Sequence, residues 1–317
     1  MRPRPRDLAA LALVLSGSTA RAQHAPPRGW ALDRFEPAPA GDPFFVAEHP
    51  GYAPARPLAA ALTLSHALSP LVLRREYTDG STRDDAIVSG MLTGHLSLAG
   101  SFLHRVGLHL SLPLSLAQLG APDPTMATPL APSPSVSAGD LRVGARVRVV
   151  GDSDRTPFSL HLGAVLWLPT GATDRNTGDG RDRFEARLAL AGRIGVARWA
   201  FGVAFASRRE IDVGSVRLGD ALHFTAGLGA SLLRGRLHVG IESAIETTVR
   251  ALPSAMGGGS AAFTRDAWGG EALLGARVHL RDALSLGAAA GFGFEQAGGT
   301  PAARFILSAQ YALPAIR

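Results

Sequence analysis

Residues 106–116 read VGLHLSLPLSL, and every second residue of this stretch is a valine or a leucine. The positions between them hold glycine, histidine, serine and proline. Because successive side chains of an extended chain point to opposite faces, one face of this stretch is aliphatic and the other is small or polar. The stretch therefore predicts a β-strand with a single apolar face.

The same period of two begins at Leu58 and continues almost to the end of the chain. It predicts twelve strands, at residues 58–73, 88–98, 106–116, 141–149, 158–168, 184–193, 199–207, 222–233, 237–250, 268–280, 284–295 and 304–313. Most of these segments match the roughly 9–11 residues that a tilted strand needs to cross the hydrocarbon core of a bilayer. They are long enough to span a membrane.

Long and short connections alternate between the expected strands. The long ones are residues 74–85, 117–139, 169–183, 208–220, 251–265 and 296–303, and the short ones are residues 99–101, 151–156, 194–198, 234–236 and 281–282. Outer-membrane barrels combine short periplasmic turns, long external loops and an even number of strands, whereas a soluble sandwich gives connection lengths no reason to alternate. We therefore expect residues 57–317 to form an all-β, transmembrane, antiparallel up-and-down β-barrel in the outer membrane of a Gram-negative cell envelope, with membrane lipid around it and both chain termini in the periplasm.

The first residues have the three parts of a secretory signal peptide. Arg2, Arg4 and Arg6 give a positive start, an apolar run follows at residues 8–15, and residues 20–22 read Ala-Arg-Ala. The apolar run is well short of the roughly 20 residues of a membrane helix. We expect residues 1–22 to be removed by cleavage after Ala22.

Residues 23–56 form a proline-rich leader in which strand periodicity is absent. Its aromatic residues Trp30, Phe35, Phe44 and Phe45 suggest docking on a surface or in a pore mouth. The proline content favours the other interpretation, a loosely ordered periplasmic linker.

Composition excludes several classes of protein. The chain has 32 basic residues against 26 acidic ones without a basic block, so nucleic acid is not an expected partner. Cysteine is absent, so no disulfide holds the fold. Mean hydropathy is +0.13, yet no stretch approaches 18 consecutive apolar residues, which excludes helical membrane spans.

The polar face of the strands is expected to line the lumen. Its ionisable side chains are the candidates for a solute path: Arg142, Arg146, Arg148, Arg187, Glu242, Glu246, Glu271, Arg277, Glu295, His109 and His161. Arginines on one side of the ring would face carboxylates on the other. If water separates them, the field across the lumen suits a low-selectivity channel or transporter for small polar solutes.

If the opposed charges pair instead, the barrel is a non-conducting structural or surface-displayed element. Glycines such as Gly144, Gly275 and Gly287 leave the wall thin, which favours a narrow pore. We expect a monomer by default.

Enzymatic and metal-binding readings have little support in the sequence. His95 and Ser97, and likewise His109 and Ser111, have the His-x-Ser spacing of one type of outer-membrane lipase, but no third group completes a catalytic set. We therefore expect no enzyme, with an outer-membrane hydrolase as a distant alternative. The histidines of the polar face are spread over different strands, and residues 174–180 match a calcium loop only in part, so no metal or other cofactor is expected.

Four short motifs resemble a known family. They are residues 32–37 (LDRFEP), 41–46 (GDPFFV), 139–146 (GDLRVGAR) and 167–171 (WLPTG). Together they resemble the N-terminal barrel of OmpA-like outer-membrane proteins, and the last of them also resembles outer-membrane transporters. The resemblance implies an outer-membrane barrel over nearly the whole mature chain. In that family acidic calcium-binding repeats and a peptidoglycan-binding domain often follow the barrel, but this sequence ends at Arg317, directly after the last expected strand, so we do not expect peptidoglycan anchoring.

Overall fold

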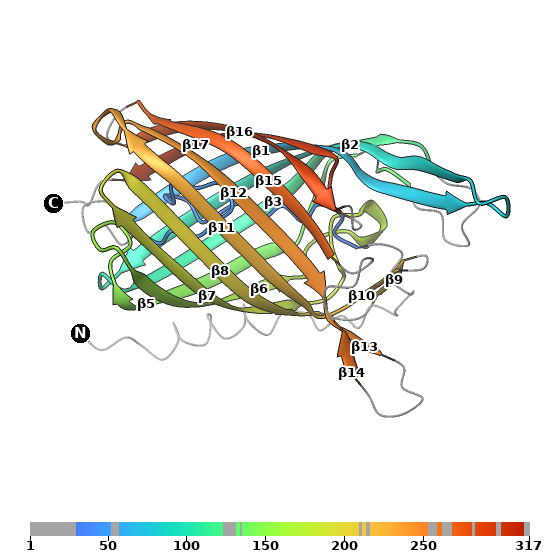
Figure 1. Ribbon diagram of the computed structural model, residues 1–317, viewed down its shortest axis with the longest axis horizontal. Coiled ribbons are helices and arrows are strands. Elements are labelled where there is room, and N and C mark those ends of the chain that lie inside the picture. The colour runs from blue at the N-terminus through green and yellow to red at the C-terminus, as the bar shows by residue number, and fades with distance from the viewer. Residues whose placement is uncertain are drawn as a thin grey trace, which may run out of the picture.

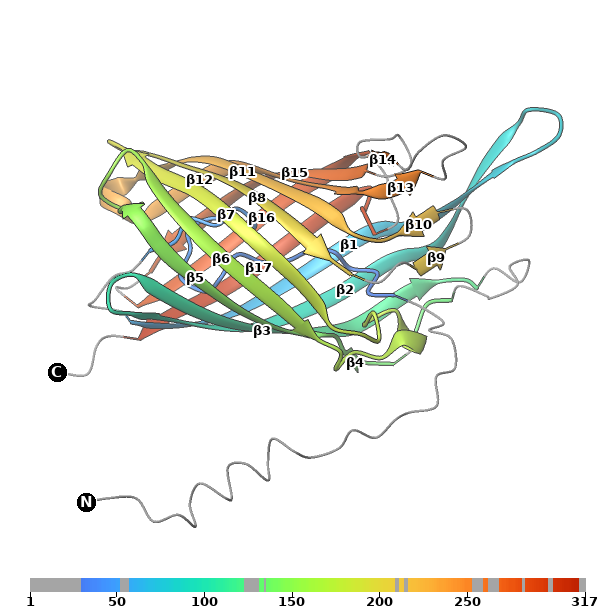
Figure 2. The ribbon, with the colours of Figure 1, turned by 90° about the horizontal axis from the view of Figure 1, so that it is seen from below.

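A computed structural model of the chain shows a single closed barrel (Figures 1 and 2). It describes residues 30–313 except 52–56, 123–130, 134, 209–210, 214–215, 253–258, 262–267, 281–282 and 296–298. The ring consists of β1 (Leu58–Glu76), β2 (Thr82–Phe102), β3 (Val106–Gly120), β5 (Leu141–Gly151), β6 (Ser159–Leu168), β7 (Arg183–Ile194), β8 (Ala197–Ser207), β11 (Ala221–Leu232), β12 (Leu237–Thr248), β15 (Trp268–His279), β16 (Leu284–Glu295) and β17 (Ala303–Leu313).

All neighbours in the ring are antiparallel, and the ring closes because β1 pairs with both β2 and β17. Closure leaves no free sheet edge around the wall, as a sheet in lipid requires. The prediction of twelve antiparallel strands is confirmed, and β16 has the predicted bounds.

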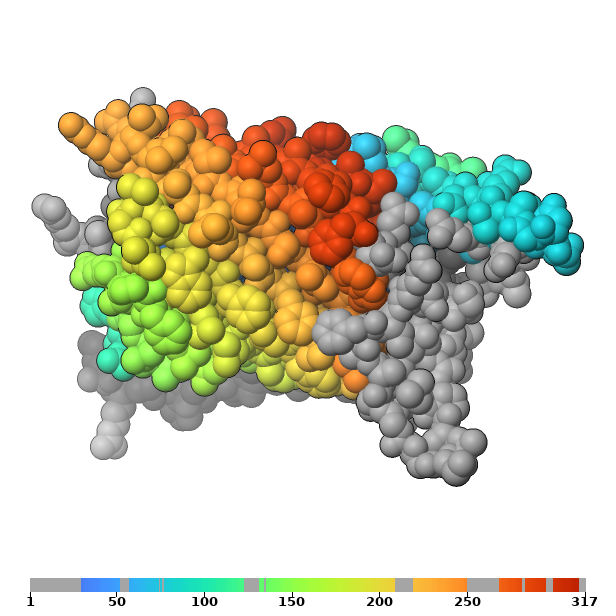
Figure 3. Space-filling view, viewed as in Figure 1, coloured from blue at the N-terminus to red at the C-terminus, as the bar shows by residue number. Residues whose placement is uncertain are grey.

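Alternation along each strand separates the two faces of the wall. In β3, Leu108 and Leu110 are 48% and 43% exposed on the outside, while His109 and Ser111 are buried on the inside. The space-filling view shows that side chains of neighbouring strands close the outer surface of the wall (Figure 3). The aliphatic face predicted to meet lipid is the outer face.

The two ends of the barrel differ. The long-loop end carries the connections from β3 to β5, β6 to β7, β8 to β11, β12 to β15 and β16 to β17, and the short-turn end carries the connections from β2 to β3, β5 to β6, β7 to β8, β11 to β12 and β15 to β16. The short hairpins β9 (Ile211–Val213) with β10 (Val216–Leu218), and β13 (Arg250–Leu252) with β14 (Gly259–Ala261), belong to the long-loop end, as do β4 (Ser137–Ala138) and the 3₁₀ turn η1 (Thr173–Arg175). A second 3₁₀ turn, η2 (Leu233–Gly235), lies at the short-turn end. Among the described residues, no helix is long and apolar enough to cross a membrane.

Two predicted connections were wrong. The turn expected at residues 99–101 lies at residues 103–105, where Leu103 and His104 have positive φ angles of 51° and 54° and the Arg105 N–H donates to the Phe102 carbonyl at 3.1 Å. Non-glycine residues seldom adopt this conformation, so residues 103–105 carry no turn signal in the sequence.

The other is the loop expected at residues 74–85, which is a hairpin that extends beyond the ring (Figure 2). Its strands pair from Leu73 opposite Asp85 to Glu76 opposite Thr82, and Arg75 Nε forms an ion pair with Asp85 at 3.4 Å. The turn at its tip has Gly80 at φ +79° and a hydrogen bond from the Tyr77 N–H to the Ser81 carbonyl. Outside the lipid a strand needs no apolar face, so its residues lacked the pattern used to find strands.

Residues 30–51, here called the lumen segment, pass through the inside of the barrel (Figure 2). At the long-loop end the Leu32 N–H donates to the Asn176 carbonyl at 3.0 Å. At the short-turn end the Ser153 hydroxyl donates to the Pro50 carbonyl, and His49 Nε2 lies 3.3 Å from the Gly192 carbonyl oxygen. The interpretation of this part of the leader as a loosely ordered linker was therefore wrong, because its charges and aromatic rings find partners inside the wall.

Other expectations about the two ends of the chain stay predictions. The signal peptide and its cleavage site, the first residues of the leader, and the last four residues lie outside the described residues. Trp30, the first described residue, lies at the long-loop end, whereas β17 ends at the short-turn end.

The outer face gives a test of the membrane assignment. Leu274 lies midway along β15 and is 61% exposed, so Leu274→Arg places a charge against acyl chains and costs about 2–4 kcal/mol of folding stability near the bilayer midplane. Tyr77→Arg, at the tip of the projecting hairpin, is the matched control and leaves stability unchanged. Reversible urea unfolding in lipid vesicles measures both; equal stabilities for the two variants would contradict a lipid-facing wall.

Candidate functional site

Opposite charges hold the lumen segment against the wall. Among the described residues, six wall arginines contact it: Arg142, Arg146, Arg183, Arg187, Arg277 and Arg304. The segment supplies four carboxylates, on Asp33, Glu36, Asp42 and Glu48, and one arginine, Arg34. An acidic segment thus neutralises a basic wall, which is what buried charges require.

Asp42 and Arg146 form a bidentate ion pair. Two parallel hydrogen bonds of 2.8 Å join the carboxylate oxygens of Asp42 to Nη1 and Nη2 of Arg146, and both side chains are buried. Glu48 lies beside this pair, with Oε2 3.5 Å from Arg146 Nη1 and Oε1 2.6 Å from Arg187 Nη1. This part of the lumen segment is fixed to β5 and β7 at once.

Glu36 binds the same wall nearer the long-loop end. Its Oε2 lies 2.8 Å from Arg187 Nη2 and 3.9 Å from Arg142 Nη1, and its Oε1 lies 3.4 Å from Arg183 Nη2. The Arg183 guanidinium also stacks over the Trp167 ring at 4.2 Å. Glu36 and Glu48 therefore share one guanidinium, that of Arg187.

Glu242, on β12, binds backbone instead of a side chain. Its carboxylate accepts hydrogen bonds from the N–H groups of Phe45, Val46 and Ala47 at 2.7–3.0 Å. An extended segment inside a barrel has no strand to pair with, so its N–H groups need such partners. Glu242 supplies acceptors for three of them.

Two further ion pairs fix the part of the segment near the long-loop end. Arg34 pairs with Glu246, which also accepts from Arg208 at 3.0 Å. Asp33 pairs with Arg304 at 3.1 Å, and Arg304 in turn binds Glu271 at 2.7 and 2.9 Å. The segment is therefore bound to opposite sides of the ring.

Glycines of the wall make room for two phenylalanine rings of the lumen segment. A Cβ added at Gly275 would lie 2.5 Å from the Phe45 ring, and one added at Gly240 would lie 3.2 Å from the Phe44 ring. The guanidinium of Arg277 also lies over the Phe45 ring, with its carbon 4.8 Å from the ring centroid. The space beside these glycines, which we expected to be part of an open pore, is filled by the two phenylalanine rings.

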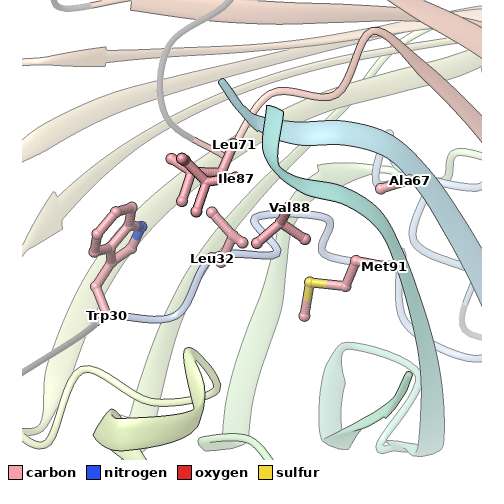
Figure 4. Close-up of a cluster of buried hydrophobic side chains, with 7 residues drawn as sticks. All are labelled: Trp30, Leu32, Ala67, Leu71, Ile87, Val88 and Met91. Atoms are coloured by element: carbon pink, nitrogen blue, oxygen red, sulfur yellow. The ribbon is translucent and has the colours of Figure 1, made fainter. Parts of the chain in front are cut away.

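A hydrophobic cluster closes the long-loop end of the segment (Figure 4). Trp30 and Leu32 lie there among residues of β1 and β2, namely Ala67, Leu71, Ile87, Val88 and Met91. All are at least nine-tenths buried. This cluster anchors the segment where it enters the barrel.

Most of the residues predicted to line a solute path lie inside the barrel, and most of them form hydrogen bonds or ion pairs. Besides the contacts above, His109 Nε2 lies 3.5 Å from Arg142 Nη2, His161 Nε2 lies 2.9 Å from the Ser159 hydroxyl, and Arg148 pairs with Asp152 in a short turn at 2.8 Å. Glu295 ends β16 at the long-loop end, and its side chain lies outside the description. Sequence reasoning missed the leader carboxylates, although their alternation with aromatic residues is the signal that could have found them.

The other motifs gave no reactive arrangement. Ser97 and Ser111 hydroxyls lie 3.0 Å apart, and His95 makes an edge contact with Phe35 at 5.5 Å between ring centroids. In the loop at residues 174–180, the Asp179 carboxylate accepts from the Ala31 N–H at 2.9 Å. Within the described ranges, no group of three His, Cys, Asp or Glu residues is placed to hold a metal ion.

A cavity of about 180 Å³ remains between the lumen segment and the wall. It reaches from Asn176 and Thr300 at the long-loop end to Glu48 and Arg187 deeper in the lumen. The arginine side chains of β5 and β7 thus border space that a small solute can occupy.

Comparisons with solved structures place this architecture. The COG4313 outer membrane channel from Pseudomonas putida F1 is similar with a TM-score of 0.60 and 13% sequence identity, over 82% of this chain and 97% of that one. The NanC porin is similar with a TM-score of 0.50 and 6% identity, over 80% of this chain and all of that one. This chain has the fold of an outer-membrane β-barrel channel. No protein-family model and no curated protein matches the sequence.

The contact between Gly275 and Phe45 predicts a way to loosen the lumen segment. Gly275→Ala inserts a methyl group into the space of the ring and costs about 1–3 kcal/mol, as overpacking does. Limited proteolysis of the folded protein in detergent measures the result as faster cleavage within residues 30–51.

Gly94→Ala is the control, since its added Cβ meets only ordinary contacts of 3.5 Å or more on the outer face. Adding Phe45→Ala to Gly275→Ala relieves the clash with the ring, though not the 2.9 Å approach to the Ala289 Cβ, and measures the coupling of the two sites. Unchanged cleavage in Gly275→Ala would show that Phe45 does not rest on this glycine.

Proposed function

We propose that this protein is an outer-membrane channel for small polar solutes whose lumen segment restricts the path. The observation that carries the proposal is the charged, partly open interior, in which residues 30–51 are held by ion pairs and ring contacts and add no strand to the wall. Such contacts can be exchanged for water and solute without breaking the ring of paired strands. Polar solutes suit a path bordered by arginine and glutamate side chains.

The similar solved structures support the channel rather than an enzyme, since the two described above are a channel and a porin by name. The His-x-Ser pairs lend no support to hydrolysis, because their serine hydroxyls face each other. The OmpA-like relationship stays a hypothesis resting on its four short motifs.

The alternative function, a non-conducting structural barrel, is favoured by one observation. A cavity of about 180 Å³ lies beside the lumen segment, and this segment runs from one end of the barrel to the other. In that case the ion pairs serve stability alone. Conductance separates the two functions.

The orientation follows from the connection lengths. We propose that the short-turn end and the end of β17 face the periplasm and that the long-loop end faces outward, as in other outer-membrane barrels. Cleavage after Ala22 then starts the mature chain at residue 23. The monomer stays the default assembly.

Charge reversal at two wall residues tests the channel. Arg146→Glu sets a carboxylate against Asp42 and Glu48, and breaking a buried pair of this kind costs about 3–5 kcal/mol. Glu242→Arg removes the acceptors for the three N–H groups of residues 45–47. We expect both variants to show larger single-channel conductance than the wild type in planar bilayers.

Arg234→Glu, in a short turn away from the lumen segment, is the control with unchanged conductance. If the wild type and both lumen variants show no conductance, in preparations shown to be folded, the non-conducting barrel is favoured instead.

A further inference from the structure

The side chains of Arg142, Arg183 and Arg187, here called the arginine cluster, border the cavity together with Glu36 and Glu48. The two glutamates occupy the guanidinium groups of this cluster in the described state. A carboxylate on a side chain and a carboxylate on a free solute have the same charge and the same planar pair of oxygens. Guanidinium groups bind both in the same way.

We propose that the arginine cluster is a binding site for a small dicarboxylate, and that Glu36 and Glu48 occupy it until such a solute takes their place. This inference rests on the proposed channel function and names the solute class of that channel. Both glutamates bind Arg187, through Nη2 and Nη1 respectively, so the two carboxylate positions lie close together. A molecule with two carboxylates a few bonds apart fits both positions.

Glu36 and Glu48 are the replaceable carboxylates of the segment. Their side chains are 23% and 12% exposed, whereas Asp42 is 2% exposed and bound by two short hydrogen bonds to Arg146. They face the cavity, so an incoming solute reaches their partners directly, and Asp42 does not line it. Exchange at this point leaves the Asp42–Arg146 pair intact.

The wall keeps the cluster ready for a ligand after exchange. Arg187 Nε binds Glu185, a residue of its own strand, and the Arg183 guanidinium stacks on Trp167. Neither contact involves the lumen segment. The guanidinium groups of Arg183 and Arg187 therefore keep a contact with the wall whether or not Glu36 and Glu48 are bound.

Trp167 also provides a binding signal, because it lies under the Arg183 guanidinium. Succinate is titrated into the full-length protein in detergent at constant ionic strength, with tryptophan fluorescence as the readout and uncharged succinamide as the control solute. We expect a saturable change with succinate alone. Trp167→Phe should abolish the change while the other tryptophans, Trp30, Trp199 and Trp268, remain.

Variants assign the signal to the arginine cluster. Glu36→Gln/Glu48→Gln removes the competing carboxylates and should tighten succinate binding about tenfold or more, the effect of one charge-assisted hydrogen bond. Arg187→Gln should weaken it by a similar factor. Glu271→Gln is the control: Glu271 lines the same cavity and loses one charge, as Glu36 and Glu48 each do, but it pairs with Arg304, so its loss should leave the affinity unchanged.

Planar bilayers then separate this inference from the channel function. In a KCl gradient, the reversal potential of Glu36→Gln/Glu48→Gln should shift toward anion selectivity relative to the wild type. Absence of a Trp167-dependent response to succinate, or equal affinities in Glu36→Gln/Glu48→Gln and Glu271→Gln, overturns the dicarboxylate site even if the protein conducts. Succinate binding without conductance in any variant overturns the channel and leaves the site.

Discussion

Charge pairing inside the barrel is the constraint on which the rest of this structure depends. In the part of the chain that the structure describes, six wall arginines contact the lumen segment, but only two wall glutamates do, Glu242 and Glu246. A ring of paired strands encloses them, so each charge must be hydrated or paired. Residues 30–51 meet this requirement with carboxylates, with backbone carbonyls at Pro37 and Pro43, and with N–H groups directed at Glu242.

The same pairing explains why the lumen segment can be both specific and exchangeable. Two contacts fix the position of the segment along the wall. The Phe44 and Phe45 rings pack against wall glycines, and Asp42 pairs with Arg146. Glu36 and Glu48 face the remaining cavity and contact groups that a solute can also bind. A path for polar solutes and a segment that restricts it thus use one set of side chains.

The wall could be predicted from the sequence, because its physical rule is local. Lipid outside the wall and a polar lumen inside it impose a period of two on every strand. The prediction that Leu108 faces outward and His109 faces inward was therefore correct. The projecting hairpin was missed where this rule stops, since strands beyond the lipid need no apolar face. The turn at residues 103–105 was missed because Leu103 and His104 hold positive φ angles without a glycine.

The lumen segment could not be placed by any periodic rule. Its contacts join residues more than a hundred positions apart, such as Asp42 with Arg146, and proline content alone favoured an unstructured linker. Complementarity was nevertheless visible in the sequence, as carboxylates and aromatics in the leader and arginines and glycines on the strands. The wall glycines do not mark an open pore, because the Phe44 and Phe45 rings fill the space beside them.

A disulfide between segment and wall tests the central claim most directly, because the chain has no cysteine of its own. A Cβ at Gly227 would lie 2.9 Å from that of Ala47, so the double variant Ala47→Cys/Gly227→Cys brings two thiols within bonding reach after a small adjustment. The account predicts that mild oxidation in isolated outer membranes cross-links this pair and lowers single-channel conductance, and that reductant restores it. Failure of the pair to cross-link in folded protein, or a cross-link without effect on conductance, would contradict a lumen segment that restricts the path.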